Sequence, residues 1–129
     1  MKFKVIDHNI PTPSVYSLKI NLKFKSSIGT DIIRLKIEHV LEEIADELHK
    51  QGCKLIGHIK AQLDAGPGGN YFFSITEFAT RTKTKGRTIS RIQTAIIKIN
   101  VIVYHVSNEK LKRIVENYFN EERINSNDN

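Results

Sequence analysis

The sequence predicts a single α+β domain with the element order β-α-β-β-β-α. Three observations support this fold class. Residues 14–25 alternate between apolar and polar side chains, apolar residues recur every three or four positions over residues 33–48, and a glycine-proline turn separates two strand-like runs within residues 53–79. Alternation with period two is typical of a half-buried strand, and a period near 3.6 is typical of an amphipathic helix. The length of 129 residues is usual for one domain.

The first strand is expected at residues 14–25, after an extended lead that Pro11 and Pro13 interrupt because proline lacks a backbone donor. The other face of this strand is mostly serine, lysine and asparagine. The side chains of its predicted core face are Tyr16, Leu18, Ile20, Leu22 and Phe24.

The first helix follows a loop at residues 26–29. Thr30 or Asp31 is expected to cap it, because both residue types accept hydrogen bonds from the first helical turn. Gly52 is expected to terminate the helix as a C′ glycine. The predicted buried stripe is Ile33, Ile37, Val40, Leu41, Ile44 and Leu48.

Three more strands are expected at residues 53–63, 71–79 and 92–106, with the first two joined by a turn at residues 65–70. The polar face of the strand at 53–63 is predicted to carry Lys54, Ile56, His58, Lys60 and Gln62. Both faces of the strand at 71–79 carry aromatic residues. Two sets are therefore credible as its core face: Tyr71, Phe73 and Ile75, or Phe72 and Phe78.

A last helix is expected after Ser107 or Asn108, either of which can cap it. The domain then spans residues 1–119, and residues 120–129 form a polar tail that is predicted to be frayed. The predicted buried stripe of this helix is Leu111, Ile114, Val115, Tyr118 and Phe119.

The element order suggests two layers. We expect a parallel crossover from the first strand through the helix to the second, followed by antiparallel hairpins, in a mixed four-stranded sheet. Both helices should cover one face, as a variant of the ferredoxin-like arrangement. The open face would then carry Ile56, Ile102, an aromatic residue, and the polar side chains Lys19, Asn21, Lys23, His58, Lys60, Lys98 and Asn100.

Composition limits the function classes. The net charge of +6 and the pI of about 9.5 allow an anionic partner. The single cysteine, Cys53, excludes an internal disulfide and is expected to be buried. No stretch reaches the roughly 18 apolar residues of a membrane helix, and the N-terminus does not resemble a signal peptide. We therefore expect a cytoplasmic protein.

Residues 81–91 form a basic segment that is predicted to be a loop. Such a loop can bind phosphates through side chains and backbone amides. Together with the lysines of the sheet face it suggests a nucleic-acid surface, although the aromatic motif of RNA-recognition sheets is absent. The cations of this segment are Arg81, Lys83, Lys85, Arg87 and Arg91.

No catalytic or metal-binding constellation is predicted. The glycine-rich turn leads into a strand rather than a helix, unlike a phosphate-binding P-loop. His39 and Glu43 could share one metal on the first helix, but no third ligand is identifiable and a solvated helix face is favoured. His58, beside Lys60, is interpreted as structural or as a partner contact, because acid/base catalysis needs a positioned partner group.

Three segments together resemble a known family. They are Gly57-His58-Ile59-Lys60-Ala61 after a helix, Ile99-Asn100-Val101-Ile102-Val103-Tyr104, and a terminal helix with Asn108-Glu109-Lys110-Leu111 and Ile114-Val115. Over residues 14–119 the chain resembles the C-terminal domain of CobW-type GTPases, which are linked to cobalamin synthesis. The family's P-loop and Cys-x-Cys-Cys motif are absent. The resemblance therefore implies a stand-alone accessory domain that acts with a nucleotide-binding or cobalamin-related partner.

The favoured hypothesis is a non-enzymatic accessory domain that self-associates or docks a protein partner through the open sheet face. The alternative is a nucleic-acid-binding module that uses the 81–91 segment and the lysine-rich face. Neither hypothesis requires a cofactor, a metal or a membrane. The candidate partner or anion contacts are His58, Lys60, Arg81, Lys83, Lys85, Arg87, Arg91, Lys98 and Asn100.

Overall fold

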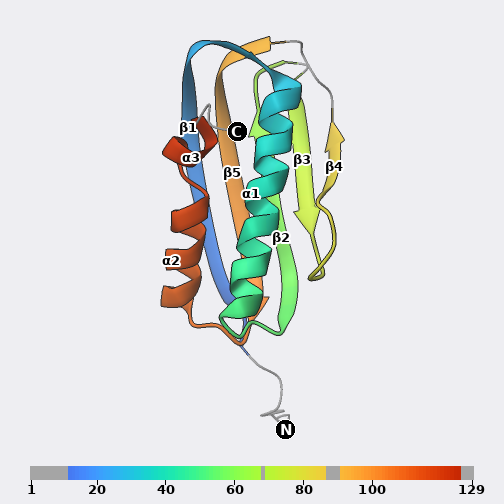
Figure 1. The fold of residues 1–129 in the computed structure, drawn as a ribbon, viewed down its shortest axis with the longest axis vertical. Helices are drawn as coiled ribbons and strands as arrows, with labels where there is room; N and C mark the ends of the chain where they lie inside the picture. Colours follow the sequence, from blue (N-terminus) through green and yellow to red (C-terminus); the bar gives the residue numbers. More distant parts are fainter. Residues whose placement is uncertain (1–11, 68, 87–90, 126–129) are drawn as a thin grey trace, which may run out of the picture.

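The computed structural model describes residues 12–67, 69–86 and 91–125, and these form one α+β domain. The elements are β1 (Ser14–Gly29), α1 (Thr30–Lys50), β2 (Leu55–Asp64), β3 (Asn70–Ile75), β4 (Lys83–Gly86), β5 (Arg91–Tyr104), α2 (Asn108–Tyr118) and α3 (Glu121–Asn125), as Figure 1 shows.

The strands form one five-stranded antiparallel sheet in the order β1-β5-β2-β3-β4. The predicted mixed four-stranded sheet is therefore wrong. β1 and β2 do run parallel, but β5 lies between them and pairs with both. An α-helix is about 10 Å wide, which matches two strand spacings of about 4.8 Å. The crossover through α1 thus leaves room for one strand, and β5 fills that space.

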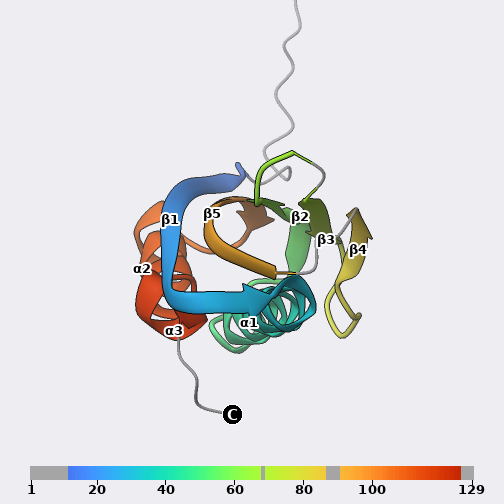
Figure 2. The same ribbon diagram turned by 90° about the horizontal axis from the view of Figure 1, so that it is seen from above.

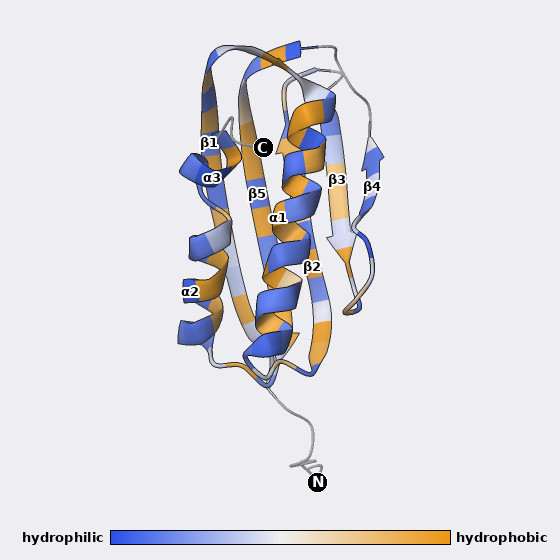
Figure 3. Ribbon diagram, in the orientation of Figure 1, coloured by the Kyte–Doolittle hydropathy of each residue, from blue (hydrophilic) through white to orange (hydrophobic). Residues whose placement is uncertain are grey.

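The helices cover one face of the sheet. Figure 2 shows α1, α2 and α3 gathered on one side of the curved strands. The apolar stripes of α1 and α2 are buried, with only Tyr118 partly exposed, so both predicted stripes are confirmed. Along β1 and β5, hydrophobic residues alternate with hydrophilic ones, as Figure 3 shows.

The two ends of α1 differ in how they match the sequence. Gly52 has a φ of +101° and lies just past the helix, as predicted. The amide of Cys53 donates to the Leu48 carbonyl at 2.9 Å, which completes a Schellman motif. The predicted Thr30 or Asp31 cap is wrong, because β1 runs directly into the helix and Gly29 occupies the cap position with no side-chain cap bond.

A bulge in β2 changes which of its residues face the core. The register shifts between Ile56 and His58, and the bulge lies at Gly57. A Cβ atom on Gly57 would lie 2.9 Å from the carbonyl oxygen of Ile102, so the close approach of the strands requires glycine. Ile56 is buried and Leu55 is 51% exposed, whereas the sequence placed Ile56 on the open face.

β3 resolves the alternative that the sequence left open. Tyr71, Phe73 and Ile75 are buried, while Phe72 is 53% exposed on the opposite face. Phe78 lies beyond the end of β3, partly buried, with its ring 4.7 Å from that of His49. The predicted hairpin turn is confirmed, because the amide of Ala65 donates to the Gly69 carbonyl at 2.8 Å.

Two elements form where the sequence indicated irregular chain. β4 lies inside the basic segment that was predicted to be a loop, and of that segment residues 87–90 lie outside the described residues. α3 lies inside the predicted polar tail, where Ile124 is fully buried. The predicted cap of α2 is confirmed, since the Ser107 hydroxyl accepts from the Lys110 amide at 3.1 Å.

α2 is fixed to the edge of the sheet by side chains of β1. The hydroxyl of Tyr16 donates to the Glu116 carboxylate, and this hydrogen bond raises the pKa of Tyr16 to about 12. The Asn108 side chain accepts from the Val15 amide at 3.0 Å. These contacts hold the helical layer against β1 and leave the opposite face of the sheet uncovered by the described helices.

Candidate functional site

The open face of the sheet, which points away from the helices, carries two rows of side chains across all five strands. Each row follows the strand register from β1 through β5, β2 and β3 to β4. The first row is Lys19, Lys98, Gln62, Phe72 and Lys85. The second row is Ser17, Asn100, Lys60, Ser74 and Lys83.

These two rows line an open groove of about 830 Å³. The ten side chains of the rows all contribute to it, and strand residues such as Leu18 and Ile99 complete its walls. Five of the lining residues are lysines, and among the described residues no Asp or Glu lines the groove. We call this feature the lysine groove.

The lysines of the groove are not neutralised by neighbours. Lys19 and Lys98 are direct cross-strand partners, and like charges in such positions are destabilising. Within the part of the chain that the structure describes, none of the five ammonium groups forms an ion pair. The groove is therefore a positive surface available to an anion.

Acidic side chains are concentrated in the helical layer. Apart from Asp64 and Glu77, every described Asp and Glu lies on α1, α2 or α3. Asp64 ends β2, and its carboxylate accepts from the Gly66 amide at 3.0 Å within the hairpin turn. The two layers of the domain thus carry opposite charges, and the net charge of +6 understates how positive the sheet face is.

Ser17, Asn100 and His58 form a hydrogen-bonded chain across β1, β5 and β2. The Ser17 hydroxyl donates to Asn100 Oδ1 at 2.7 Å, and Asn100 Nδ2 lies 3.0 Å from His58 Nε2. An amide nitrogen only donates, so Nε2 is the acceptor and is unprotonated. Burial, with a smaller contribution from Lys60, lowers the pKa of His58. Through this contact His58 orients Asn100 beside the groove.

The nine residues predicted as contacts separate into groups. Lys60, Lys83, Lys85, Lys98 and Asn100 all line the lysine groove. His58 lies beside it through its contact with Asn100. Arg81 precedes β4 and does not line the groove, and Arg87 lies outside the described residues.

Arg91 is directed away from the groove. Its guanidinium donates to the hydroxyl of Ser27 at 2.9 Å and to the carbonyl of the same residue at 2.6 Å. The sequence alone did not single out Phe72, Gln62, Ser17 and Ser74 as contacts. The signal that unites them is the strand register, which depends on pairings distant in sequence.

The edge strand β4 is held by carboxylates of α1. The amide of Thr82 donates to Glu42 Oε2 at 2.9 Å, and its hydroxyl donates to the same oxygen at 3.0 Å. The hydroxyl of Thr84 donates to the carboxylate of Glu38. Because side chains alternate along a strand, threonines directed at the helix leave Lys83 and Lys85 on the groove side.

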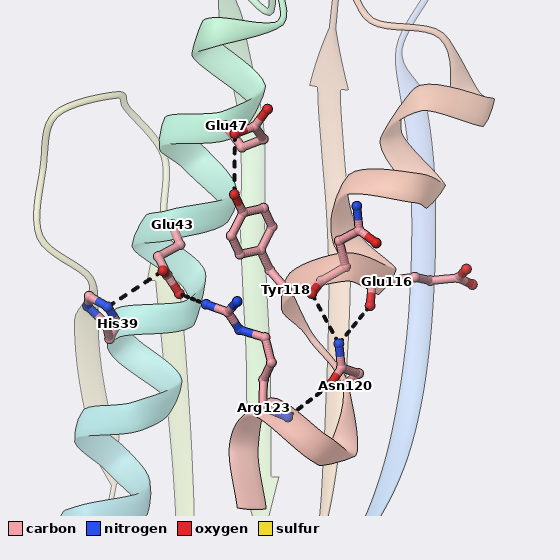
Figure 4. Close-up of polar contacts among 8 residues, drawn as sticks. His39, Glu43, Glu47, Glu116, Tyr118, Asn120 and Arg123 are labelled. Atoms are coloured by element: carbon pink, nitrogen blue, oxygen red, sulfur yellow. Dashed lines mark hydrogen bonds and ion pairs between the residues drawn. The ribbon is translucent and has the colours of Figure 1, made fainter. Parts of the chain in front are cut away.

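A second polar cluster joins α1 to the C-terminal helices (Figure 4). Arg123 donates to Glu43 at 2.8 Å and lies 5.0 Å from the ring centre of Tyr118, whose hydroxyl donates to Glu47 at 3.3 Å. The sequence suggested His39 and Glu43 as residues that could share a metal. In the structure they lie at ion-pair distance, with 3.7 Å between His39 Nε2 and Glu43 Oε2. Among the described residues, no group of three or more His, Cys, Asp or Glu could hold a metal ion.

Comparisons of the chain with protein families, with curated proteins and with solved structures found no match. No helix in the described part of the chain is both long and apolar enough to cross a membrane.

Proposed function

We propose that this domain is a non-catalytic nucleic-acid-binding module whose binding surface is the lysine groove. The observation that carries the proposal is the unneutralised cross-strand pair of Lys19 and Lys98 within a groove that no acidic side chain of the described ranges lines. A phosphate between two such ammonium groups replaces a repulsion with two attractions.

The spacing of the lysines suits a phosphate backbone. Neighbouring strands lie about 4.8 Å apart, so the rows extend roughly 19 Å from β1 to β4. Lysines occur at both ends of this span and at its centre. Each lysine that neutralises a phosphate also releases counterions, which favours binding at low salt.

The charge of the groove favours one of the two hypotheses that the sequence raised. In a two-fold symmetric dimer the same surface meets itself. Two copies joined through this face would place lysines against lysines, and the groove residues that the structure describes supply no carboxylate to offset them. The nucleic-acid hypothesis is preferred for this reason.

The direct test is fluorescence anisotropy of a labelled oligonucleotide over a series of salt concentrations. The groove variant Lys19→Ala/Lys60→Ala/Lys98→Ala should bind more weakly, and the slope of log affinity against log salt should become shallower by about 1 for each phosphate that is no longer neutralised. The matched control is Lys50→Ala/Lys54→Ala/Lys112→Ala, which removes the same charge at exposed positions outside the groove. An equal reduction of affinity in both variants would reject the groove as the binding surface.

A protein partner is the second candidate, and a separate part of the open face favours it. Val15 and Leu55 are half exposed, and Ile102 is paired with Val15 beyond the lysine rows. Such an apolar patch suits a partner of the kind that the resemblance to CobW-type GTPases implies, or a second copy of the chain. Light scattering at low and high salt tests self-association, because a dimer formed by this patch should persist in high salt.

A further inference from the structure

We infer that the lysine groove takes a single-stranded segment that runs across the strands, with one base stacked on Phe72. This inference rests on the proposed function and names the class of nucleic acid. It depends on the position of one aromatic side chain among the lysines.

Among the described residues of the two rows, Phe72 is the only aromatic one. Its side chain is exposed to solvent, with 53% of its surface accessible. Its register partners are Gln62 on β2 and Lys85 on β4. The residues on either side of it in β3, Tyr71 and Phe73, are buried on the opposite face. The exposure of Phe72 is therefore not a consequence of a loosely packed strand.

Lysines lie on both sides of this ring along the groove. Lys85 occupies the next strand in one direction, and Lys98 follows Gln62 in the other. In the second row, Lys60 and Lys83 flank Ser74 in the same way. A single-stranded nucleic acid with one base stacked on Phe72 would thus have lysines near the phosphates that precede and follow that base.

This arrangement suits an unpaired strand better than a duplex. The bases of a duplex are stacked on one another, and proteins read them with a helix or β-ribbon inserted in the major groove. Phe72 instead lines a hollow on a sheet. Single-strand-binding surfaces combine a positive groove with aromatic side chains on which bases stack, and each such stack contributes roughly 5- to 150-fold in affinity.

The absence of tryptophan from the sequence permits a specific spectroscopic test. In the Phe72→Trp variant, addition of an unlabelled oligothymidylate should quench the fluorescence of the single tryptophan, because the indole stacks on a base. The matched control is Leu35→Trp on α1, where the native side chain is 57% exposed and does not line the groove. Its fluorescence should stay unchanged.

Anisotropy supplies the second measurement. The single strand should bind more tightly than a duplex of the same length and label. Phe72→Leu, which keeps an apolar side chain, should weaken single-strand binding by roughly 5- to 150-fold. Phe72→Tyr should retain the affinity of the native chain, and circular dichroism should confirm that both variants are folded.

The outcomes separate this inference from the proposed function. Equal affinity for duplex and single strand, with no effect of Phe72→Leu, would overturn the inference, while weaker binding by the lysine variant would still support the proposed function. Failure of the native chain to bind either nucleic acid would overturn both. Binding of poly-glutamate with the same affinity as the oligonucleotide would also overturn both and indicate an acidic protein partner.

Discussion

Lys19 and Lys98 are expected to make opposite contributions to stability and to the proposed binding of nucleic acid. In the free protein their ammonium groups repel across β1 and β5, because they are direct partners in the register. In a complex the same two groups would share a phosphate. A residue pair of this kind is expected where function, rather than folding, determines the side chain.

Removal of one of these two lysines should relieve the repulsion between them. Lys98→Ala should raise the free energy of unfolding by about 0.2–1 kcal/mol at low salt, and the gain should shrink at high salt as the repulsion is screened. The same variant should bind an oligonucleotide more weakly. Urea unfolding at two salt concentrations measures the first effect. Lys112→Ala, at an exposed position on α2, serves as the control and should change stability by less than about 0.5 kcal/mol.

His58 links the polar chain on the sheet to pH. Burial, and after it Lys60, keep its folded pKa below the ordinary value of 6.5. The unfolded chain therefore takes up this proton at a higher pH than the folded chain does. The contribution of His58 to the free energy of unfolding is fully present above about pH 6.5 and is lost as the pH falls through the folded pKa.

The expected result is a steeper decline of stability in the native chain than in His58→Gln when the pH is lowered from about 7 to about 5. Chemical denaturation at each pH gives the two curves. An NMR titration of the His58 ring should independently show a midpoint below 6.5. Parallel curves for the two proteins would contradict the assignment.

At the scale of elements, β4 depends on α1 for its position. Glu42 accepts two hydrogen bonds from Thr82, and hydrogen bonds to a charged acceptor contribute about 1.5–3 kcal/mol each. The Thr82 hydroxyl also lies 3.2 Å from the Glu38 carbonyl and keeps that acceptor, so Glu42→Ala should remove about one such bond and lower the local opening free energy of β4 by about 1.5–3 kcal/mol. Amide hydrogen exchange at residues 83–86 measures this opening.

Glu43→Ala is the control for that experiment. Glu43 lies next to Glu42 in sequence, but its carboxylate pairs with Arg123 and lies 3.7 Å from His39. Exchange in β4 should therefore stay as in the native chain. If it accelerates equally, the helix as a whole and not the Glu42 carboxylate determines the stability of β4.

Local sequence patterns predicted most of the helices and strands, but few of the pairings between strands. Burial in these elements follows a short sequence period. The apolar stripes of α1 and α2 and the alternation along β1 and β5 could therefore be predicted. β4 was missed because Thr82, Lys83, Thr84 and Lys85 alternate between two polar residue types, so no hydrophobic period marks the strand. The bulge at Gly57 was missed because it depends on the approach of Ile102, which is far away in sequence.

The candidate site was likewise predictable only in part. Four of its five lysines were identified by composition and face, and Lys19 was already placed on the open face. The arrangement of these lysines around Phe72 was not predictable, because it requires the order in which β5, β2 and β3 lie side by side. α3 was assigned to a tail because one buried residue, Ile124, creates no period.

At the scale of the molecule, the C-terminal segment completes the core. Ile124 has no exposed surface, its carbonyl accepts from Lys36 at 3.5 Å, and the adjacent Arg123 pairs with Glu43. Ile124→Ala should lower the free energy of unfolding by about 2–5 kcal/mol, as for other large-to-small core substitutions. Thermal or urea unfolding measures it. Glu122→Ala, exposed on the same short helix, should be nearly neutral.

The central position of β5 governs the order in which the chain can assemble during synthesis. β1 leaves the ribosome first, yet its strand partner in the described sheet is β5, the last strand to be made. Until then β1 has an unpaired edge, while β2, β3 and β4 can already join as neighbouring hairpins. Pairings so distant in sequence are slow to form. A nascent chain that stops short of residue 91 would therefore hold an open strand edge, the feature from which intermolecular pairing and aggregation begin.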